Sequence, residues 1–217
     1  MERELAVCEV FRSIQGETTR AGLPCTFVRT AGCNLHCAWC DTEYARTGPG
    51  EPTPLARVRD AVLALGTRLV CITGGEPLLQ AEAVGALSTA LLAAGRTVLL
   101  ETNGSLDMSA VPAGVVRIMD VKCPGSGECG TTRADNVAAL RAVDEAKFVL
   151  ADRADFDWAV DFVRGHGLEH GPQVLFSAVQ GRLEPRDLAA WILKAGLEVR
   201  LQVQLHKLLW PGRDRGV

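Results

Sequence analysis

The sequence predicts an α/β fold, a partial, open (β/α) barrel that is trimmed relative to a complete eight-fold barrel. The first observation is alternation: apolar, β-branched runs typical of strands are separated by segments with helical periodicity. Such alternation indicates βα units and a mostly parallel sheet. The second is length, because the chain has 217 residues and a complete barrel takes about 250. Since no repeat or long linker interrupts the pattern, a single domain over residues 1–217 is expected.

Eight strands are predicted, at residues 6–11, 26–30, 69–73, 97–101, 116–121, 146–150, 174–178 and 199–203. Five helices are predicted between them, at residues 55–65, 78–94, 135–143, 155–164 and 185–194. The first helix follows Pro52 and Pro54. Gly165 and Gly196 stand where a helix C-cap favours glycine.

The turns that follow the strands carry unusual residues, whereas the turns that follow the helices are plainer. The first group comprises residues 13–17, 31–33, 74–77, 102–104, 122–125, 177–181 and 204–207. In parallel α/β folds the carboxyl ends of the strands meet at one edge, where binding and catalysis gather. The sequence therefore predicts a functional site along that edge.

The composition is ordinary for a globular protein, with 47% hydrophobic and 23% charged residues and a formal net charge of −3. The sequence lacks the excess of basic residues that would indicate direct nucleic-acid binding. No segment has the pattern of a signal peptide or the roughly 20 apolar residues of a membrane span, so we expect a cytoplasmic protein without a membrane partner. Eight cysteines then indicate reduced thiols. Cys8, Cys25 and Cys71 are interpreted as small core residues.

Three cysteines form the most informative motif. Cys33, Cys37 and Cys40 are separated by three and then two residues, in a short loop that begins at Gly32. Three thiolates can hold three corners of a four-iron cluster, whose full set of protein ligands is four. The fourth iron can then bind another molecule. This pattern favours an enzyme that uses the cluster in its chemistry.

A zinc site is the alternative interpretation of the same cysteines. Its fourth ligand would be His36, Cys123 or Cys129. Zinc prefers closed four-ligand sites with paired short spacings, and His36 between two of the cysteines would strain such a site. A non-catalytic iron–sulfur or zinc module is therefore one of the open alternatives.

Two further segments accompany the cysteine loop. Residues 73–77 read Thr-Gly-Gly-Glu-Pro, and residues 120–122 read Asp-Val-Lys, each at the end of a predicted strand. Two glycines expose backbone polar groups, and a carboxylate suits an ammonium group. With the C-x3-C-x2-C loop, these segments resemble the radical S-adenosylmethionine (SAM) superfamily. The resemblance implies a [4Fe–4S] cluster on the three cysteines, SAM chelated to the open iron, and one-electron cleavage of SAM to a 5′-deoxyadenosyl radical.

Five segments indicate one family within this superfamily. They are residues 13–17, 27–33, 40–42, 120–127 and 204–207. Nearly the whole chain, from Phe11 to Pro211, resembles the 7-carboxy-7-deazaguanine synthase family of queuosine and 7-deazapurine biosynthesis. The resemblance implies a lyase that contracts the ring of 6-carboxy-5,6,7,8-tetrahydropterin with loss of ammonia, using SAM catalytically and Mg²⁺ as an aid. It also implies a flavodoxin or ferredoxin as electron donor and a homodimer.

The resemblance assigns roles to individual residues, while the cluster and SAM carry the chemistry. Substrate contacts are expected from Ile14, Gln15, Gly16, Glu17, Arg29, Thr73, His206 and Pro211. SAM contacts are expected from Ala38, Trp39, Gly75, Glu76, Asp120, Val121, Lys122, Ser177 and Gln180. Thr42 matches the Mg²⁺ ligand. The guanidinium of Arg29 suits the substrate carboxylate, and the amide of Gln15 suits the amide and amino edge of a pterin.

Two departures from the family pattern are visible. Thr18 follows Glu17 where the family commonly has glycine, which indicates a less flexible loop. Residues 212–217 continue past Pro211, which leaves the substrate contact of Pro211 open. Another radical SAM enzyme, such as an activase that installs a glycyl radical in a partner protein, is the second alternative.

Overall fold

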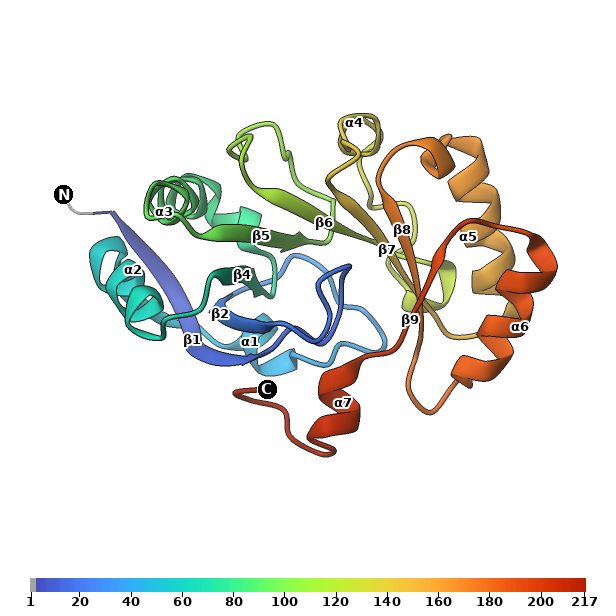
Figure 1. The fold of residues 1–217 in the computed structure, drawn as a ribbon, viewed down its shortest axis with the longest axis horizontal. Helices are drawn as coiled ribbons and strands as arrows, with labels where there is room; N and C mark the ends of the chain where they lie inside the picture. The colour runs from blue at the N-terminus through green and yellow to red at the C-terminus, as the bar shows by residue number, and fades with distance from the viewer. Residues whose placement is uncertain (1–2) are drawn as a thin grey trace.

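The computed structural model describes residues 3–217, which contain one curved, nine-stranded sheet with helices along its outer face (Figure 1). The strands are β1 (Glu4–Ile14), β2 (Pro24–Thr30), β3 (Glu51–Pro54), β4 (Leu69–Gly74), β5 (Thr97–Thr102), β6 (Val116–Val121), β7 (Glu145–Leu150), β8 (Gln173–Ala178) and β9 (Arg200–Gln202). The α-helices are α1 (Glu43–Thr47), α2 (Leu55–Ala64), α3 (Ala81–Ala93), α4 (Ala134–Ala138), α5 (Arg153–Gly165), α6 (Pro185–Ala195) and α7 (Leu205–Leu209). Three short 3₁₀ helices are η1 (Pro77–Gln80), η2 (Pro124–Ser126) and η3 (Leu168–His170). Met1 and Glu2, which belong to the expected domain, lie outside the described residues.

The strand order is β3-β1-β2-β4-β5-β6-β7-β8-β9. β1 pairs antiparallel with β2 and β3, and each neighbouring pair from β2 to β9 is parallel. The sheet does not close, because β3 and β9 remain its two edges. The prediction of a partial, open barrel with a mostly parallel sheet is confirmed.

All eight predicted strands are present, and β3 is an addition to them. Pro52 and Pro54 disfavour a strand in the middle of a sheet. Here they lie on an edge strand that pairs only with β1, Pro52 opposite Ala6 and Pro54 opposite Glu4. An edge strand tolerates proline because its outward side takes no part in the hydrogen-bond ladder.

Two details of the predicted helices are wrong. The helix expected at residues 135–143 stops at Ala138, because the carboxylate of Asp144 accepts the N–H of Arg141 at 2.9 Å and the chain turns there. Gly165 is the last residue of α5 and His166 is its C-cap, while the left-handed glycine beyond the helix is Gly167, with φ of 64°.

The remaining helices agree more closely with the sequence. Gly196 is the left-handed C-cap of α6, as predicted. The helix expected at residues 78–94 is divided into η1 and α3, and the segment at 204–207, predicted as a turn, begins α7. Within residues 3–217, none of the helices has the length and apolar character needed to cross a membrane.

Side chains alternate between the two faces of each strand, and this alternation creates two apolar clusters. The larger cluster lies between the outer face and helices α2, α3, α5 and α6. The smaller cluster lies on the inner face and contains Cys25, Phe27, Leu69, Cys71, Leu99, Val116 and Ile118. The next inner positions on these strands are polar, namely Arg29, Thr73, Glu101 and Asp120. A polar row therefore continues the inner face toward the carboxyl ends of the strands.

The interpretation of three cysteines as core residues holds for two of them. Cys25 and Cys71 are fully buried in the inner cluster. Cys8 is only half-buried, because it occupies a β-bulge between Val7 and Glu9, where the register with β2 shifts.

Candidate active site

A cavity of about 790 Å³ opens where the strands end, on the inner side of the sheet. Most residues singled out from the sequence line it. They are Ile14, Gln15, Gly16, Glu17, Arg29, Cys33, Cys37, Trp39, Cys40, Thr42, Thr73, Gly75, Asp120, Lys122, Gln180, His206 and Pro211. Segments from both ends of the chain thus meet in one space, at the edge where the site is expected.

The cysteine loop forms one wall of this cavity. Cys33, Cys37 and Cys40 all face it, and their thiols are free of disulfides. Burial raises the pKa of the Cys33 and Cys37 thiols. Gly32 enters the loop with φ of 87°, a left-handed conformation that favours glycine.

Gly75 allows the second motif to pack against this loop. A Cβ atom at Gly75 would lie 2.0 Å from the carbonyl oxygen of Gly32 and 2.9 Å from Cβ of Cys33. Such contacts are impossible without moving the loop. The Gly-Gly-Glu segment therefore sets the position of the first cysteine through direct backbone contact.

None of the three fourth ligands considered for the alternative zinc site lines the cavity. The Cys123 side chain is buried in the outer core, and its thiol donates to the carbonyl oxygen of Val121. Cys129 and His36 are exposed and do not line the cavity. Among the described residues, no three or more His, Cys, Asp or Glu side chains gather as a site for a single ion. Three free thiols that face the cavity fit the three protein ligands of a cluster with one open iron.

Glu76 is engaged in hydrogen bonds within the protein. Its fully buried carboxylate accepts hydrogen bonds from the N–H groups of Leu78 (2.9 Å) and Asn103 (2.7 Å) and from the Thr102 hydroxyl (2.9 Å). Burial raises its pKa although these donors oppose the rise. The carboxylate joins the ends of β4 and β5, and Glu76 is not among the residues that line the cavity.

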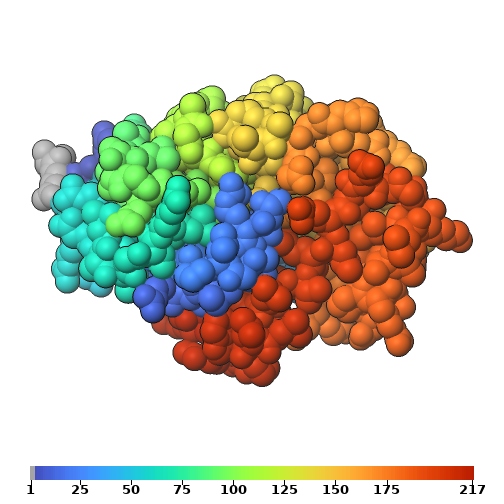
Figure 2. Space-filling model, in the orientation of Figure 1, coloured from blue at the N-terminus to red at the C-terminus, as the bar shows by residue number. Residues whose placement is uncertain are grey.

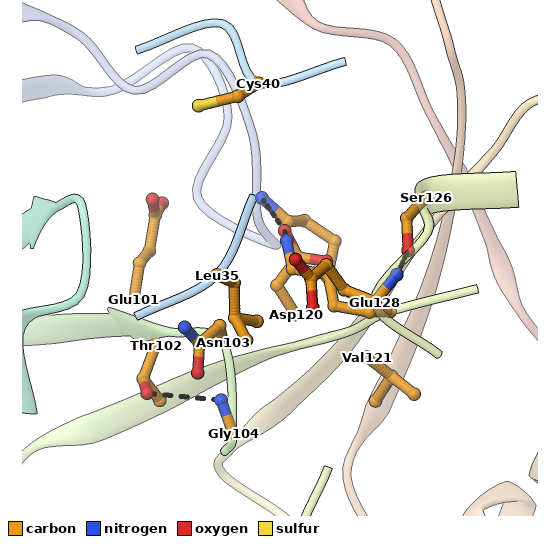
Figure 3. Close-up of polar contacts among 12 residues, drawn as sticks. Leu35, Cys40, Glu101, Thr102, Asn103, Gly104, Asp120, Val121, Ser126 and Glu128 are labelled. Atoms are coloured by element: carbon orange, nitrogen blue, oxygen red, sulfur yellow. Dashed lines mark hydrogen bonds and ion pairs between the residues drawn. The ribbon is translucent and has the colours of Figure 1, made fainter. Parts of the chain in front are cut away.

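Three other predicted SAM contacts also lie outside the cavity lining. The side chain of Val121 is packed in the outer core and in Figure 3 points away from Asp120 and Cys40. Ala38 donates its N–H to the carbonyl oxygen of Ser126 at 2.9 Å. Ser177 is buried opposite Val149 in the β7–β8 ladder, and its hydroxyl has no partner among the described residues. Strand alternation turns the Val121 side chain outward, so the predicted SAM contact of Val121 could come only from its backbone.

The segment at residues 14–17 forms a second wall together with α7. A Cβ atom at Gly16 would lie 2.4 Å from Nδ1 of His206, so glycine is needed for this close approach. The Leu205 N–H donates to the carbonyl oxygen of Gly16 at 3.0 Å. Gln15 is buried, and within residues 3–217 its Nε2 has no partner. A buried amide donor without a protein partner fits a ligand that carries acceptor atoms.

Arg29 occupies the polar row beside Thr73. Its Nε donates to Oε1 of Glu9 at 2.9 Å, and its guanidinium lies near the rings of Phe11 and Tyr44. Burial would lower the pKa of Arg29, but Tyr44 and Glu9 reverse this effect and raise it. Arg29 is thus a fixed, permanently charged group in the cavity, as an anion site requires.

Asp120 and Lys122 lie on the inner face, where β6 ends. Lys122 Nζ is 3.0 Å from Oδ2 of Asp120. The second oxygen, Oδ1, is buried and has no partner among the described residues. A buried carboxylate oxygen left without a donor fits a ligand that presents a hydroxyl or amino group.

Thr42 follows the third cysteine and precedes α1. Its side chain makes no capping hydrogen bond to that helix, and Oγ1 lies 4.0 Å from Sγ of Cys40. The hydroxyl oxygen therefore remains available at the cavity, and oxygen is the ligand atom that Mg²⁺ prefers.

Several cavity residues were given no individual role from the sequence. Glu101 and Lys147 are the clearest. Gln204 and Asn103 belong to turns predicted to lie along the functional edge, and Nδ2 of Asn103 lies 4.0 Å from Sγ of Cys33. In Figure 3 Glu101 points into the same space as Cys40. A charged residue inside an apolar strand is the signal that could have identified Glu101 and Lys147, since such a residue is rarely buried without a partner.

The last residues of the described chain close one side of the cavity. Gly212, Arg213, Asp214 and Val217 line it beyond Pro211. The Gly216 N–H donates to Oε2 of Glu9 at 3.1 Å. Figure 2 shows this C-terminal segment, in red, lying against the N-terminal segment in blue.

This chain combines an open, mostly parallel sheet with three free thiols in a loop at the carboxyl edge of the sheet. These are features of the radical SAM class of enzymes, which use a [4Fe–4S] cluster and SAM. Residues 27–120 match the model of the Radical SAM superfamily. The fold is similar to that of QueE from Escherichia coli, with a TM-score of 0.76 and 18% identity over 93% of this chain and 94% of the other.

Curated relatives give the narrower assignment. The 7-carboxy-7-deazaguanine synthase of Koribacter versatilis is 44% identical over 98% of this chain and 100% of its own length. The synthase of Chlorobaculum tepidum is 44% identical over 100% of this chain and 99% of its own length. The chain belongs to the 7-carboxy-7-deazaguanine synthase family.

Proposed function

We propose that this chain converts 6-carboxy-5,6,7,8-tetrahydropterin into 7-carboxy-7-deazaguanine with release of ammonia, as a radical SAM lyase of queuosine and 7-deazapurine biosynthesis. The product is the one for which the relatives are named. The observation that carries the proposal is the shared cavity: three free thiols line it together with the polar side chains of Gln15, Glu17 and Arg29. A cluster-bound cofactor and a polar, carboxylated ring can therefore occupy one space.

Cys33, Cys37 and Cys40 would hold the cluster, and SAM on its open iron would supply the radical chemistry. The other residues of the site would bind and orient SAM and the substrate. Side chains or backbone of Trp39, Gly75, Asp120, Lys122 and Gln180 would bind SAM, with backbone groups of Ala38, Glu76 and Val121 and the Ser177 hydroxyl as further contacts. The unpartnered Oδ1 of Asp120 supports this assignment, because a ribose hydroxyl would satisfy it.

The pterin would lie against the second wall. The free amide donor of Gln15 would meet a pterin acceptor, and Glu17 would accept from the amino groups of the ring. Arg29 would bind the substrate carboxylate through its terminal nitrogens, since Nε is engaged by Glu9. Ile14, Gly16, Thr73, His206 and Pro211 would complete the contacts, and Thr42 would ligate Mg²⁺ through its hydroxyl.

The family resemblance supports further proposals about the cellular setting. We infer a single radical SAM domain over residues 1–217, which acts in the cytoplasm as a homodimer. A flavodoxin or ferredoxin would deliver the electron. No direct contact with nucleic acid is needed, because the substrate is a free pterin.

Anaerobic reconstitution followed by turnover tests the proposal. The protein is expected to bind about four irons and four sulfides per chain. With the tetrahydropterin, SAM, Mg²⁺ and a reductant, it is expected to form 7-carboxy-7-deazaguanine and ammonia, measured by mass spectrometry. Radical formation in a partner protein without pterin turnover would instead favour an activase.

Two cysteine variants test the cluster assignment directly. Cys37→Ala is expected to lose turnover while the far-ultraviolet circular dichroism stays native. Cys129→Ala, an exposed cysteine outside the cavity, is the matched control and is expected to retain iron and turnover. Full turnover by Cys37→Ala would contradict the assignment.

A further inference from the structure

Lys147 is a buried lysine at the base of the cavity. It lies on β7 between Ala146 and Phe148, both of which are packed in the outer core. Strand alternation therefore turns Lys147 toward the inner face, where its side chain is 9% exposed and lines the cavity. An ammonium group at this depth needs anionic partners.

Its closest partner comes from the first loop of the chain. Nζ of Lys147 donates to Oε2 of Glu17 at 2.7 Å, across 130 residues of sequence. Oε1 of Glu17 accepts from Nε2 of Gln204 at 2.7 Å. Burial would raise the pKa of Glu17, but the charge of Lys147 outweighs this effect and lowers it. Glu17 thus has one neutral and one cationic side chain as hydrogen-bond partners, and Lys147 is the partner that balances its charge.

The second partner comes from the SAM side of the cavity. Asp120 is opposite Lys147 in the parallel β6–β7 ladder, and the distance from Nζ to Oδ2 is 3.6 Å. Asp120 also has Lys122 at 3.0 Å, so it keeps a cation without Lys147. Glu17 therefore depends on Lys147 for a cationic partner more than Asp120 does.

We propose that Lys147 is a positioning residue for the pterin: its ammonium group holds the Glu17 carboxylate ionised and in place at the substrate wall, with Asp120 as the second anchor of the ammonium. The inference rests on the proposed function, in which Glu17 accepts from the ring amino groups. Lys147 acts through Glu17 and makes no contact with the substrate.

Binding measurements on the reconstituted enzyme without reductant test this role. The probe is 6-carboxypterin, the oxidised and unreactive analogue of the substrate, titrated by calorimetry in the presence of SAM and Mg²⁺. SAM is titrated separately. Lys147→Met is expected to weaken 6-carboxypterin binding by about 10- to 100-fold, the range of a hydrogen bond to a charged group. It is expected to change SAM binding by less than about 3-fold, since Asp120 keeps Lys122.

A double-mutant cycle shows whether the effect passes through Glu17. In the Glu17→Gln background, Lys147→Met is expected to change 6-carboxypterin binding by less than about 2-fold, because no carboxylate remains to be positioned. An undiminished effect in that background would overturn the proposal and indicate direct contact with the pterin. Equal losses of SAM and pterin binding, or no loss in Lys147→Met, would also overturn it.

Controls separate this role from folding and from the proposed function. Asp144→Asn disrupts a buried ion cluster outside the cavity and is expected to leave both dissociation constants unchanged. If Lys147→Met does not fold, Lys147→Arg carries the test: with the charge retained, pterin binding within about 10-fold of native is expected, and a larger loss with SAM binding intact overturns the proposal. Failure of the native enzyme to bind or convert the pterin would count against the proposed function instead.

Discussion

Nε of Arg29 lies 2.9 Å from Oε1 of Glu9, directly opposite it in the antiparallel β1–β2 ladder. Glu9 also accepts from the Tyr44 hydroxyl through Oε1 and from the Gly216 N–H through Oε2. The cation of the polar row is therefore fixed by a carboxylate that also binds the C-terminal segment. A guanidinium restrained in this way loses little freedom when it binds a carboxylate.

We expect Arg29→Ala to weaken pterin binding by about 10- to 100-fold, because a charge-assisted contact to the substrate carboxylate is lost. SAM binding is expected to stay nearly native. Titration of the reconstituted enzyme with each ligand measures the difference. Arg12→Ala, an exposed arginine on the same β1 strand as Glu9, is the control. Equal weakening of both ligands would count against a carboxylate clamp.

We expect Gly75→Ala to lower iron incorporation and to cost about 1–3 kcal/mol of unfolding free energy, the usual range for forced overpacking. The added methyl group would collide with the carbonyl oxygen of Gly32 and displace Cys33. Gly165→Ala is the matched control, since a Cβ atom there meets nothing within 4 Å and alanine favours the helix. Native iron content in Gly75→Ala would show that the loop does not depend on this contact.

Thr18 is the one non-glycine residue with positive φ among residues 3–217, at 70°. A β-branched residue is strained in this conformation. We therefore expect Thr18→Gly to be more stable than Thr18→Ala by about 1 kcal/mol, because both lose the threonine side chain and only glycine relieves the strain. Denaturant unfolding measures both.

Thr19 provides the comparison, since its φ is not positive. There the order should reverse, with alanine more stable than glycine by about 0.5–1 kcal/mol. If alanine were also the better residue at position 18, the strain argument would be wrong.

Asp144 links stability to pH at a place remote from the cavity. Burial would raise its pKa, but hydrogen bonds from Arg141 and Arg117 outweigh this effect and hold the pKa well below its usual range. A carboxyl group with a depressed folded-state pKa adds stability above its unfolded value of about 3.9 and loses it as pH falls toward the folded value.

We accordingly expect Asp144→Asn to cost about 3–5 kcal/mol at neutral pH, the range for breaking a buried ion pair. The difference from the native protein should shrink below about pH 4. Urea unfolding across this pH range measures it. The exposed pair of Asp157 with Arg153 is the control, and Asp157→Asn should change stability little. A difference that stayed constant into acid would contradict the linkage.

The sequence predicted those parts of the site that reside in single short segments. The cysteine loop, residues 14–17 and the two glycines at the end of β4 are each defined by local spacing, and all three segments contribute to the cavity lining. Val121 was assigned to the cavity because its motif was read as a unit. The alternation of β6 separates its members, with Asp120 inward and Val121 outward.

The local sequence pattern alone predicted the strand–helix alternation, the open parallel sheet and the loop of three cysteines. Strand periodicity and loop spacing depend only on neighbours along the chain. Only the tertiary structure decided which charged groups pair. Strand order and register bring distant segments within hydrogen-bond distance. Glu17 therefore accepts a hydrogen bond from Lys147, Glu9 accepts one from Arg29, and Glu76 accepts one from the backbone N–H that follows β5. Burial then makes those partnerships obligatory, since an unpaired charge beneath this cavity would be strongly unfavourable.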